Sequence, residues 1–142
     1  MDFPHPLVHS TDTPPVALAA VPRSAWGRVT LVGAGPGDAE LLTLKAARVL
    51  ASASLVLYDH LVSKDVLQYV PTGAELIYVG KQSSNHSLPQ EGIIDLMVRL
   101  AQSGRSLVRL KGGDPYIFGR GGEEAEALAA EGIACETVPG IS

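Results

Sequence analysis

The sequence predicts an α/β fold, an open and doubly wound sheet of five mainly parallel strands. Two observations carry this prediction. From residue 26 onward, short apolar runs alternate with segments of helical periodicity, and such alternation with short loops indicates parallel strands joined by crossovers. The apolar runs are also continuous, as expected for strands that are covered on both faces.

Five short runs rich in Val, Leu, Ile or Tyr supply the predicted strands. The first leads into a glycine-rich loop at Gly33, and the fifth stops at Pro139. In chain order, the predicted strands are 28–32, 54–58, 75–79, 106–110 and 134–138.

Four segments between these strands predict helices. Residues 43–53 start at Thr43, a suitable N-cap, and place Leu44, Ala47 and Leu50 on one face. The other predicted helices are 64–69, 90–102 (followed by Gly104) and 122–131 (followed by Gly132).

The composition indicates a folded globular domain and argues against several classes of protein. The 142 residues are 46% hydrophobic and 18% charged, which is enough for a real core. A net charge of -4 and an aromatic content of 5% argue against a nucleic-acid partner. The single cysteine excludes an intrachain disulfide and a four-cysteine zinc site, and the four histidines are scattered. We therefore expect no metal.

The N-terminal part of the chain differs from the rest. Residues 1–25 contain half of the ten prolines, which predicts a disordered or extended tail before a domain at 26–142. The apolar run 16–21 is far shorter than the roughly 20 residues of a membrane span. Asp2 and the late first basic residue, Arg23, do not fit a secretory signal. We expect a cytoplasmic protein without a membrane partner.

Glycines and polar residues concentrate where the predicted strands end. Parallel sheets of this kind bind ligands beyond the carboxyl ends of their strands, so these loops predict a ligand site. The loops are 33–38, 58–62, 80–82, 111–124 and 139–142.

The first loop does not match the common nucleotide-binding motifs. Gly33, Gly35 and Gly37 alternate around Pro36, and Asp38 stands where a dinucleotide fingerprint has its third glycine. A nucleotide-dependent oxidoreductase is thereby disfavoured. The structural alternative is a tight turn that needs positive φ.

Two charged residues directly follow strands and could carry chemistry. Asp59 could act as a general base in the crevice, or it could cap the following turn. Lys81 could donate a proton or clamp a carboxylate, or it could be an ordinary solvated lysine. Cys135, within an apolar strand, is read as a small core residue.

The fourth loop is the strongest feature of the sequence. Its five glycines imply close approach of the backbone to another group, Asp114 could accept hydrogen bonds from a ribose or an ammonium group, and Ile117 adds apolar surface. Three cations on a net acidic chain, Arg109, Lys111 and Arg120, suggest an anionic substrate. The acidic residues that follow, Glu123, Glu124 and Glu126, are read as the negatively charged first turn of a helix.

Taken in order, these loops resemble the tetrapyrrole methylase family, the class III S-adenosylmethionine-dependent methyltransferases. The fourth stretch is similar to the branch of the family that methylates uroporphyrinogen. The matching stretches are VGAGPGDAELLTLKA (32–46), YDHLVS (58–63), VGK (79–81), RLKGGDPYIFGRGGEE (109–124) and VPGIS (138–142).

The resemblance implies a function and a set of site residues. It implies transfer of two methyl groups from S-adenosylmethionine to pyrrole carbons of uroporphyrinogen III, giving precorrin-2, a precursor of sirohaem, cobalamin and haem d1. Asp59 matches the proton acceptor of the family and Lys81 its proton donor. The substrate has eight carboxylates, for which Arg109, Lys111 and Arg120 are the predicted partners. The residues implied to line the cofactor site are Pro36, Gly112, Gly113, Asp114, Ile117 and Ser142.

The resemblance also implies an organisation larger than this chain. Family members have two α/β domains with the cofactor between them, and they are typically homodimers. We therefore expect residues 26–142 to be the N-terminal domain, with the C-terminal domain absent. The alternative function is a catalytically inactive fragment that only binds cofactor or tetrapyrrole, or that pairs with another chain.

Overall fold

The structure, a computed structural model, describes residues 19–80, 90–113 and 121–141. Its five strands form one sheet in the order β3-β2-β4-β1-β5, and every neighbouring pair is parallel. The predicted α/β class and parallel sheet are confirmed. The strands are β1 (Val29–Gly33), β2 (Leu55–Tyr58), β3 (Glu75–Tyr78), β4 (Leu107–Lys111) and β5 (Cys135–Val138).

The described helices connect these strands as the sequence predicted, with bounds that differ by at most two residues. Thr43 caps the first α-helix as expected, because its hydroxyl accepts a hydrogen bond from the Ala46 amide. The helices are the 3-10 turns η3 (Arg23–Ala25) and η4 (Ala39–Leu41), and α1 (Leu44–Ala51), α2 (Lys64–Leu67), α3 (Gln90–Gln102) and α4 (Gly121–Ala130).

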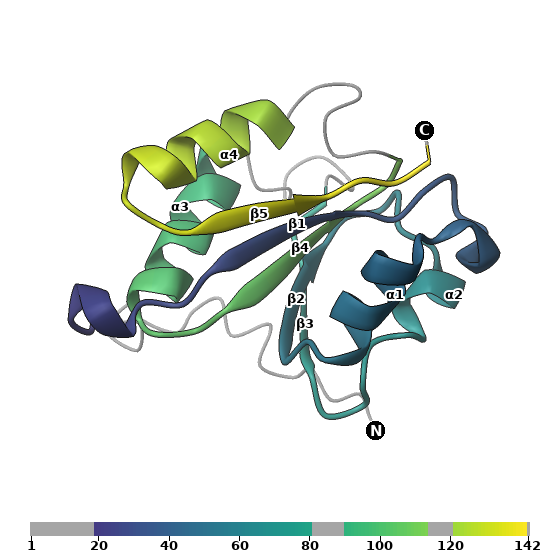
Figure 1. Cartoon of the computed structure of the whole chain (residues 1–142), viewed down its shortest axis with the longest axis horizontal. Coiled ribbons are helices and arrows are strands. Elements are labelled where there is room, and N and C mark those ends of the chain that lie inside the picture. The colour runs from purple at the N-terminus through teal and green to yellow at the C-terminus, as the bar shows by residue number, and fades with distance from the viewer. Residues whose placement is uncertain (1–18, 81–89, 114–120, 142) are drawn as a thin grey trace.

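Helices cover both faces of the sheet. Figure 1 shows α3 and α4 on one face and α1 and α2 on the other. Successive residues of a strand point to opposite faces of the sheet, so their side chains pack into two separate cores. Leu31 and Leu57 pack on the α3 and α4 side with Leu128, whereas Val32 and Val56 pack on the other side. The sheet is therefore doubly wound, and its carboxyl edge is left for loops.

The predicted apolar face of the first helix is wrong at one position. Ala46 and Leu50 are fully buried, but Leu44 is 89% exposed. Leu44 precedes Ala46 by two residues and therefore lies on the opposite side of the helix.

The described segment before β1 contacts the end of α3. The Val21 amide donates to the Gln102 carbonyl at 2.8 Å, and Trp26 Nε1 donates to the Val21 carbonyl at 3.0 Å. The Arg23 guanidinium lies 4.8 Å from the centroid of the Trp26 ring, a cation–π contact. The rest of the predicted tail, 1–18, lies outside the described residues. No helix in the described part of the chain is long and apolar enough to cross a membrane.

Candidate active site

The carboxyl edge of the sheet is closed by a junction of backbone segments. Gly35 and Gly113 exchange two backbone hydrogen bonds, at 3.1 and 2.8 Å, which join the loops after β1 and β4. Both residues have positive φ, 74° and 70°, a conformation that glycine adopts readily. A Cβ on Gly140 would lie 2.5 Å from the Gly113 carbonyl oxygen and 2.8 Å from Gly33. The loops after three strands thus meet here, and the predicted tight turn with positive φ is confirmed.

The loop after β2 joins the same edge. A Cβ on Gly112 would lie 2.6 Å from Leu61 Cβ, so the backbone after β4 passes directly over this loop. A Cβ on Gly113, by contrast, would meet no atom of the described residues within 4 Å. Among the described residues, the backbone is therefore packed against Leu61 at Gly112 and has no neighbour over the Cα of Gly113, an arrangement that could let a ligand approach this backbone closely.

The first loop carries Pro36 at its exposed tip. Asp38, two residues after Pro36, accepts a hydrogen bond from the Glu40 amide at 2.9 Å and caps η4. Asp38 thus has a local structural role, consistent with the departure of this loop from a dinucleotide fingerprint.

Asp59 follows β2 and has contacts with both the backbone and a cation. Its Oδ1 accepts a hydrogen bond from the Leu61 amide at 3.0 Å, so the predicted turn cap is confirmed. Its Oδ2 lies 3.7 Å from Arg109 Nη1. The Asp59 side chain is 16% exposed. A capped carboxylate that still reaches solvent could also accept a proton.

Arg109 lies in a buried layer of the sheet. It pairs in register with Leu31 on one side and Leu57 on the other, and it is 3% exposed. Its Nε lies 3.6 Å from Glu124 Oε2, and its Nη1 faces Asp59. Contact with a large substrate stays a prediction for Arg109, whereas its contacts with two carboxylates are explicit in the structure.

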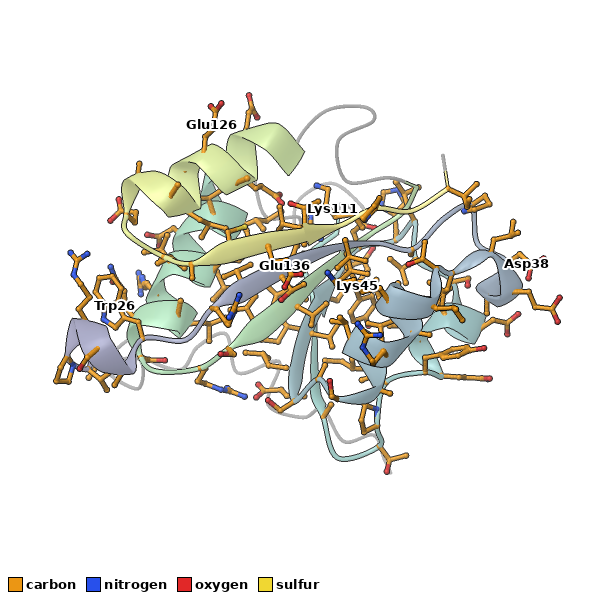
Figure 2. All side chains as sticks on the ribbon, in the orientation of Figure 1. Trp26, Asp38, Lys45, Lys111, Glu126 and Glu136 are labelled. Carbon is orange, nitrogen blue, oxygen red and sulfur yellow. The ribbon has the colours of Figure 1, made fainter. Side chains whose placement is uncertain are left out.

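Lys111, two residues along β4, faces α4. Its Nζ lies 3.5 Å from Glu124 Oε2, and its side chain is 12% exposed. Burial lowers the pKa of Lys111 from its ordinary value, while the Glu124 carboxylate acts in the opposite direction. Figure 2 shows Lys111 on the α4 side of the sheet, toward the carboxyl ends of the strands.

Two tyrosines extend the site beyond β2 and β3. The Tyr58 and Tyr78 rings pack edge to face with centroids 5.3 Å apart. Burial raises the pKa of Tyr58, and partial burial together with the Asp59 carboxylate raises the pKa of Tyr78. Tyr78 is 37% exposed, and its hydroxyl lies against Gly80. An aromatic edge therefore lies near the carboxylate.

The structure places six of the predicted site residues at the carboxyl edge of the sheet, from the loop after β1 to the loop after β4. These six are Pro36, Asp59, Arg109, Lys111, Gly112 and Gly113. The other predicted residues, Lys81, Asp114, Ile117, Arg120 and Ser142, lie outside the described residues.

Sequence reasoning missed the role of Glu124. The sequence alone assigns Glu124, with Glu123 and Glu126, to the negatively charged first turn of a helix. In the structure, Glu124 is 0% exposed and faces two cations. The available signal was the pair Arg109 and Lys111 in an otherwise apolar strand, since buried cations need a counter-ion. Within residues 19–80, 90–113 and 121–141, no cluster of His, Cys, Asp and Glu is placed to hold a metal.

A hollow lies at the opposite edge of the sheet. It has a volume of about 220 Å³ and is lined in part by Arg28, Thr30, Ser54 and Ser106, at the amino ends of β1, β2 and β4. The C-terminal end of α1, with Ser52, forms another wall. Because a helix C-terminus carries partial negative charge, this wall disfavours an anion. The carboxyl edge is the better candidate.

Comparison with known proteins decides the family. The family Tetrapyrrole (Corrin/Porphyrin) Methylases matches residues 28–142. The chain belongs to the tetrapyrrole methylase family. The predicted family is thereby confirmed, and the matched range includes all five loops at the strand ends.

The relatives of this tetrapyrrole methylase domain are longer proteins. It is 60% identical over 122 residues to siroheme synthase 1 of Pectobacterium atrosepticum, covering 86% of this chain and 25% of that protein. It is 53% identical over 116 residues to the uroporphyrinogen-III C-methyltransferase of Priestia megaterium, covering 82% of this chain and 49% of that protein. The chain thus spans half or less of the length of these relatives.

A solved structure has the same fold. The uroporphyrin-III C-methyltransferase of Thermus thermophilus, in complex with S-adenyl homocysteine, matches with a TM-score of 0.71 and 53% identity. The match covers 82% of this chain and 49% of that one.

Proposed function

We propose that this domain binds S-adenosylmethionine and takes part in the C-methylation of uroporphyrinogen III to precorrin-2. One observation carries the proposal: the bare glycine backbone of the carboxyl edge lies beside a capped, partly exposed carboxylate. Gly113 has no neighbour among the described residues on its Cβ side, whereas Gly112 is packed on Leu61, and Asp59 belongs to the same loop as Leu61. The similarity to a methyltransferase solved with S-adenyl homocysteine supports this interpretation.

The described residues fit the cofactor. Because a Cβ on Gly113 would meet no described atom within 4 Å, the described residues leave room for a ligand directly on this backbone. We assign cofactor contacts to Pro36, Gly112 and Gly113 and, as predictions from the resemblance, to Asp114, Ile117 and Ser142. S-adenosylmethionine supplies the methyl group when bound.

The charged residues then have distinct tasks. A pyrrole carbon that gains a methyl group must lose a proton, and Asp59 is the described carboxylate at this edge that can accept it. Lys111 keeps 12% of its side-chain exposure and is the better placed of the two β4 cations to meet a substrate carboxylate. Arg109 forms an ion pair with Asp59, with Nη1 3.7 Å from Oδ2. On the basis of the sequence, Lys81 is proposed as the proton donor and Arg120 as a further substrate contact.

Pathway, assembly and location are finer parts of the same proposal. Precorrin-2 would feed sirohaem synthesis, in line with the names of the relatives, and also cobalamin or haem d1 synthesis. The homodimer is proposed from the resemblance, and the cytoplasmic location from the sequence pattern, in which 16–21 is too short to span a membrane and the N-terminus does not fit a secretory signal. Light scattering of the purified protein tests the dimer.

The test is methyl transfer by the chain itself. Purified protein would be incubated without air with uroporphyrinogen III and S-adenosylmethionine that carries a labelled methyl group. Two labelled methyl groups in the tetrapyrrole product support the proposal. Binding of cofactor without transfer would instead support the alternative, an inactive fragment with a formed cofactor site.

A further inference from the structure

Four charged side chains form one chain of contacts beneath the carboxyl edge. Glu124 faces two cations, Lys111 at 3.5 Å and Arg109 at 3.6 Å, while Asp59 faces Arg109 at 3.7 Å. The innermost pair is almost completely buried, with Glu124 at 0% and Arg109 at 3% exposure. The two cations are thus balanced by two carboxylates, one deep and one at the rim.

The charge of Glu124, the buried carboxylate, affects how strongly the two cations attract Asp59, the carboxylate at the rim. Charges interact much more strongly inside a protein than in water. Without the charge of Glu124, Asp59 would be the described carboxylate that still acts on both cations: it lies 3.7 Å from Arg109, and its charge also acts on Lys111. The electrostatic attraction would then favour movement of Asp59 away from the Leu61 amide and toward the sheet.

We propose that Glu124 is a positioning residue for Asp59. The Glu124 carboxylate forms ion pairs with the Lys111 ammonium and with Nε of the Arg109 guanidinium, and it thereby offsets their positive charge. Asp59 therefore keeps its hydrogen bond to the Leu61 amide and its exposure at the rim. The effect on Asp59 is independent of the reaction, whereas its catalytic consequence rests on the proposed function.

The Leu61 amide gives a direct readout of this arrangement, because it donates to Asp59 Oδ1 at 3.0 Å. In Glu124→Gln, which keeps the shape and removes the charge, we expect the Leu61 amide resonance to shift and its hydrogen exchange to accelerate at least about threefold. The matched control is Glu126→Gln, two residues along α4. Glu126 is exposed and points away from the sheet (Figure 2), and its substitution should leave Leu61 unchanged.

A double variant tests charge balance and guards against misfolding. Removing one member of a buried ion pair can prevent folding. Glu124→Gln combined with Lys111→Met removes one charge of each sign, so it should fold and return the Leu61 amide to its wild-type shift and exchange rate. A folded Glu124→Gln protein with an unchanged Leu61 amide would overturn the proposal. So would a double variant that folds while Leu61 stays displaced.

The catalytic consequence is measured separately. Glu124→Gln should lower the single-turnover methyl-transfer rate at least about tenfold, as loss of a well-placed base does. Its affinity for S-adenosylhomocysteine should stay within about twofold of wild type, and Glu124→Asp should restore part of the rate. If the wild-type chain transfers no methyl group, the proposed function of the isolated chain fails, and the Leu61 readout still decides the role of Glu124.

Discussion

Gly140 lies where the ends of β1, β4 and β5 come together, and its substitution tests the backbone junction at the carboxyl edge. In Gly140→Ala, the new Cβ would lie 2.5 Å from the Gly113 carbonyl oxygen and 2.8 Å from the carbonyl carbon and oxygen of Gly33. Ordinary contact begins at about 3.4 Å, so the closest pair would be roughly 0.9 Å too near. All three neighbours are backbone atoms, which cannot turn away as a flexible side chain can.

The expected cost follows from this rigidity. Overpacking typically costs about 1–3 kcal/mol, and we expect a value near 3 kcal/mol because Gly113 is also held by two hydrogen bonds to Gly35. With a urea dependence of about 2 kcal/mol per molar, the unfolding midpoint should fall by about 1.5 M. The assay is urea unfolding followed by circular dichroism.

The matched control is Gly73→Ala. A Cβ on Gly73 would meet no described atom within 4 Å, and the φ of Gly73 lies outside the left-handed region. This substitution should leave the free energy of unfolding unchanged or raise it by up to about 1 kcal/mol. If Gly140→Ala proves as stable as Gly73→Ala, the three backbone segments do not meet as described, and the cradle argument fails with them.

Two further predictions concern titrating groups. Burial and, secondarily, the Glu124 carboxylate raise the pKa of the Cys135 thiol. Alkylation of this single cysteine should therefore have its pH midpoint above the ordinary value of 9.0, and Glu124→Gln should lower that midpoint. A wild-type midpoint at or below 9.0 would contradict the packing around Cys135. The hydrogen bond that Lys45 donates at 2.6 Å lowers the pKa of Glu136; both side chains are labelled in Figure 2. A lowered carboxyl pKa contributes stability above the ordinary value of 4.5 that is lost as pH falls through the folded pKa. Glu136→Gln should therefore be slightly less stable than wild type at pH 7 and equal to it at low pH in urea unfolding, and a deficit that persists at low pH would refute the assignment.

The sequence was sufficient to predict the elements but not their order in the sheet. Continuous apolar runs such as 54–58 identify strands because both faces are buried, and Thr43 identifies a helix start because its hydroxyl caps an amide. The placement of β1 between β4 and β5 depends on crossovers that no local pattern specifies.

The site was predictable in outline for the same reason. Loops after parallel strands share one edge, so Asp59 and the Gly112–Gly113 segment could be grouped from sequence alone. Glu124 could not be singled out, because Glu123, Glu124 and Glu126 look equivalent until α4 packs on the sheet and buries one of them. The same packing places the Arg109 guanidinium between carboxylates, which the strand pattern did not show.

The most direct test of the central claim is to map the binding of S-adenosylhomocysteine on the folded chain. The backbone amide spectrum of the labelled protein would be recorded during titration with this ligand. The account predicts saturable shifts at Gly35, Gly112 and Gly113, at the carboxyl edge, and unchanged amides at Thr30 and Ser106, in the hollow at the amino edge. Shifts confined to the amino-edge hollow, or no saturable shifts from a folded chain, would contradict it.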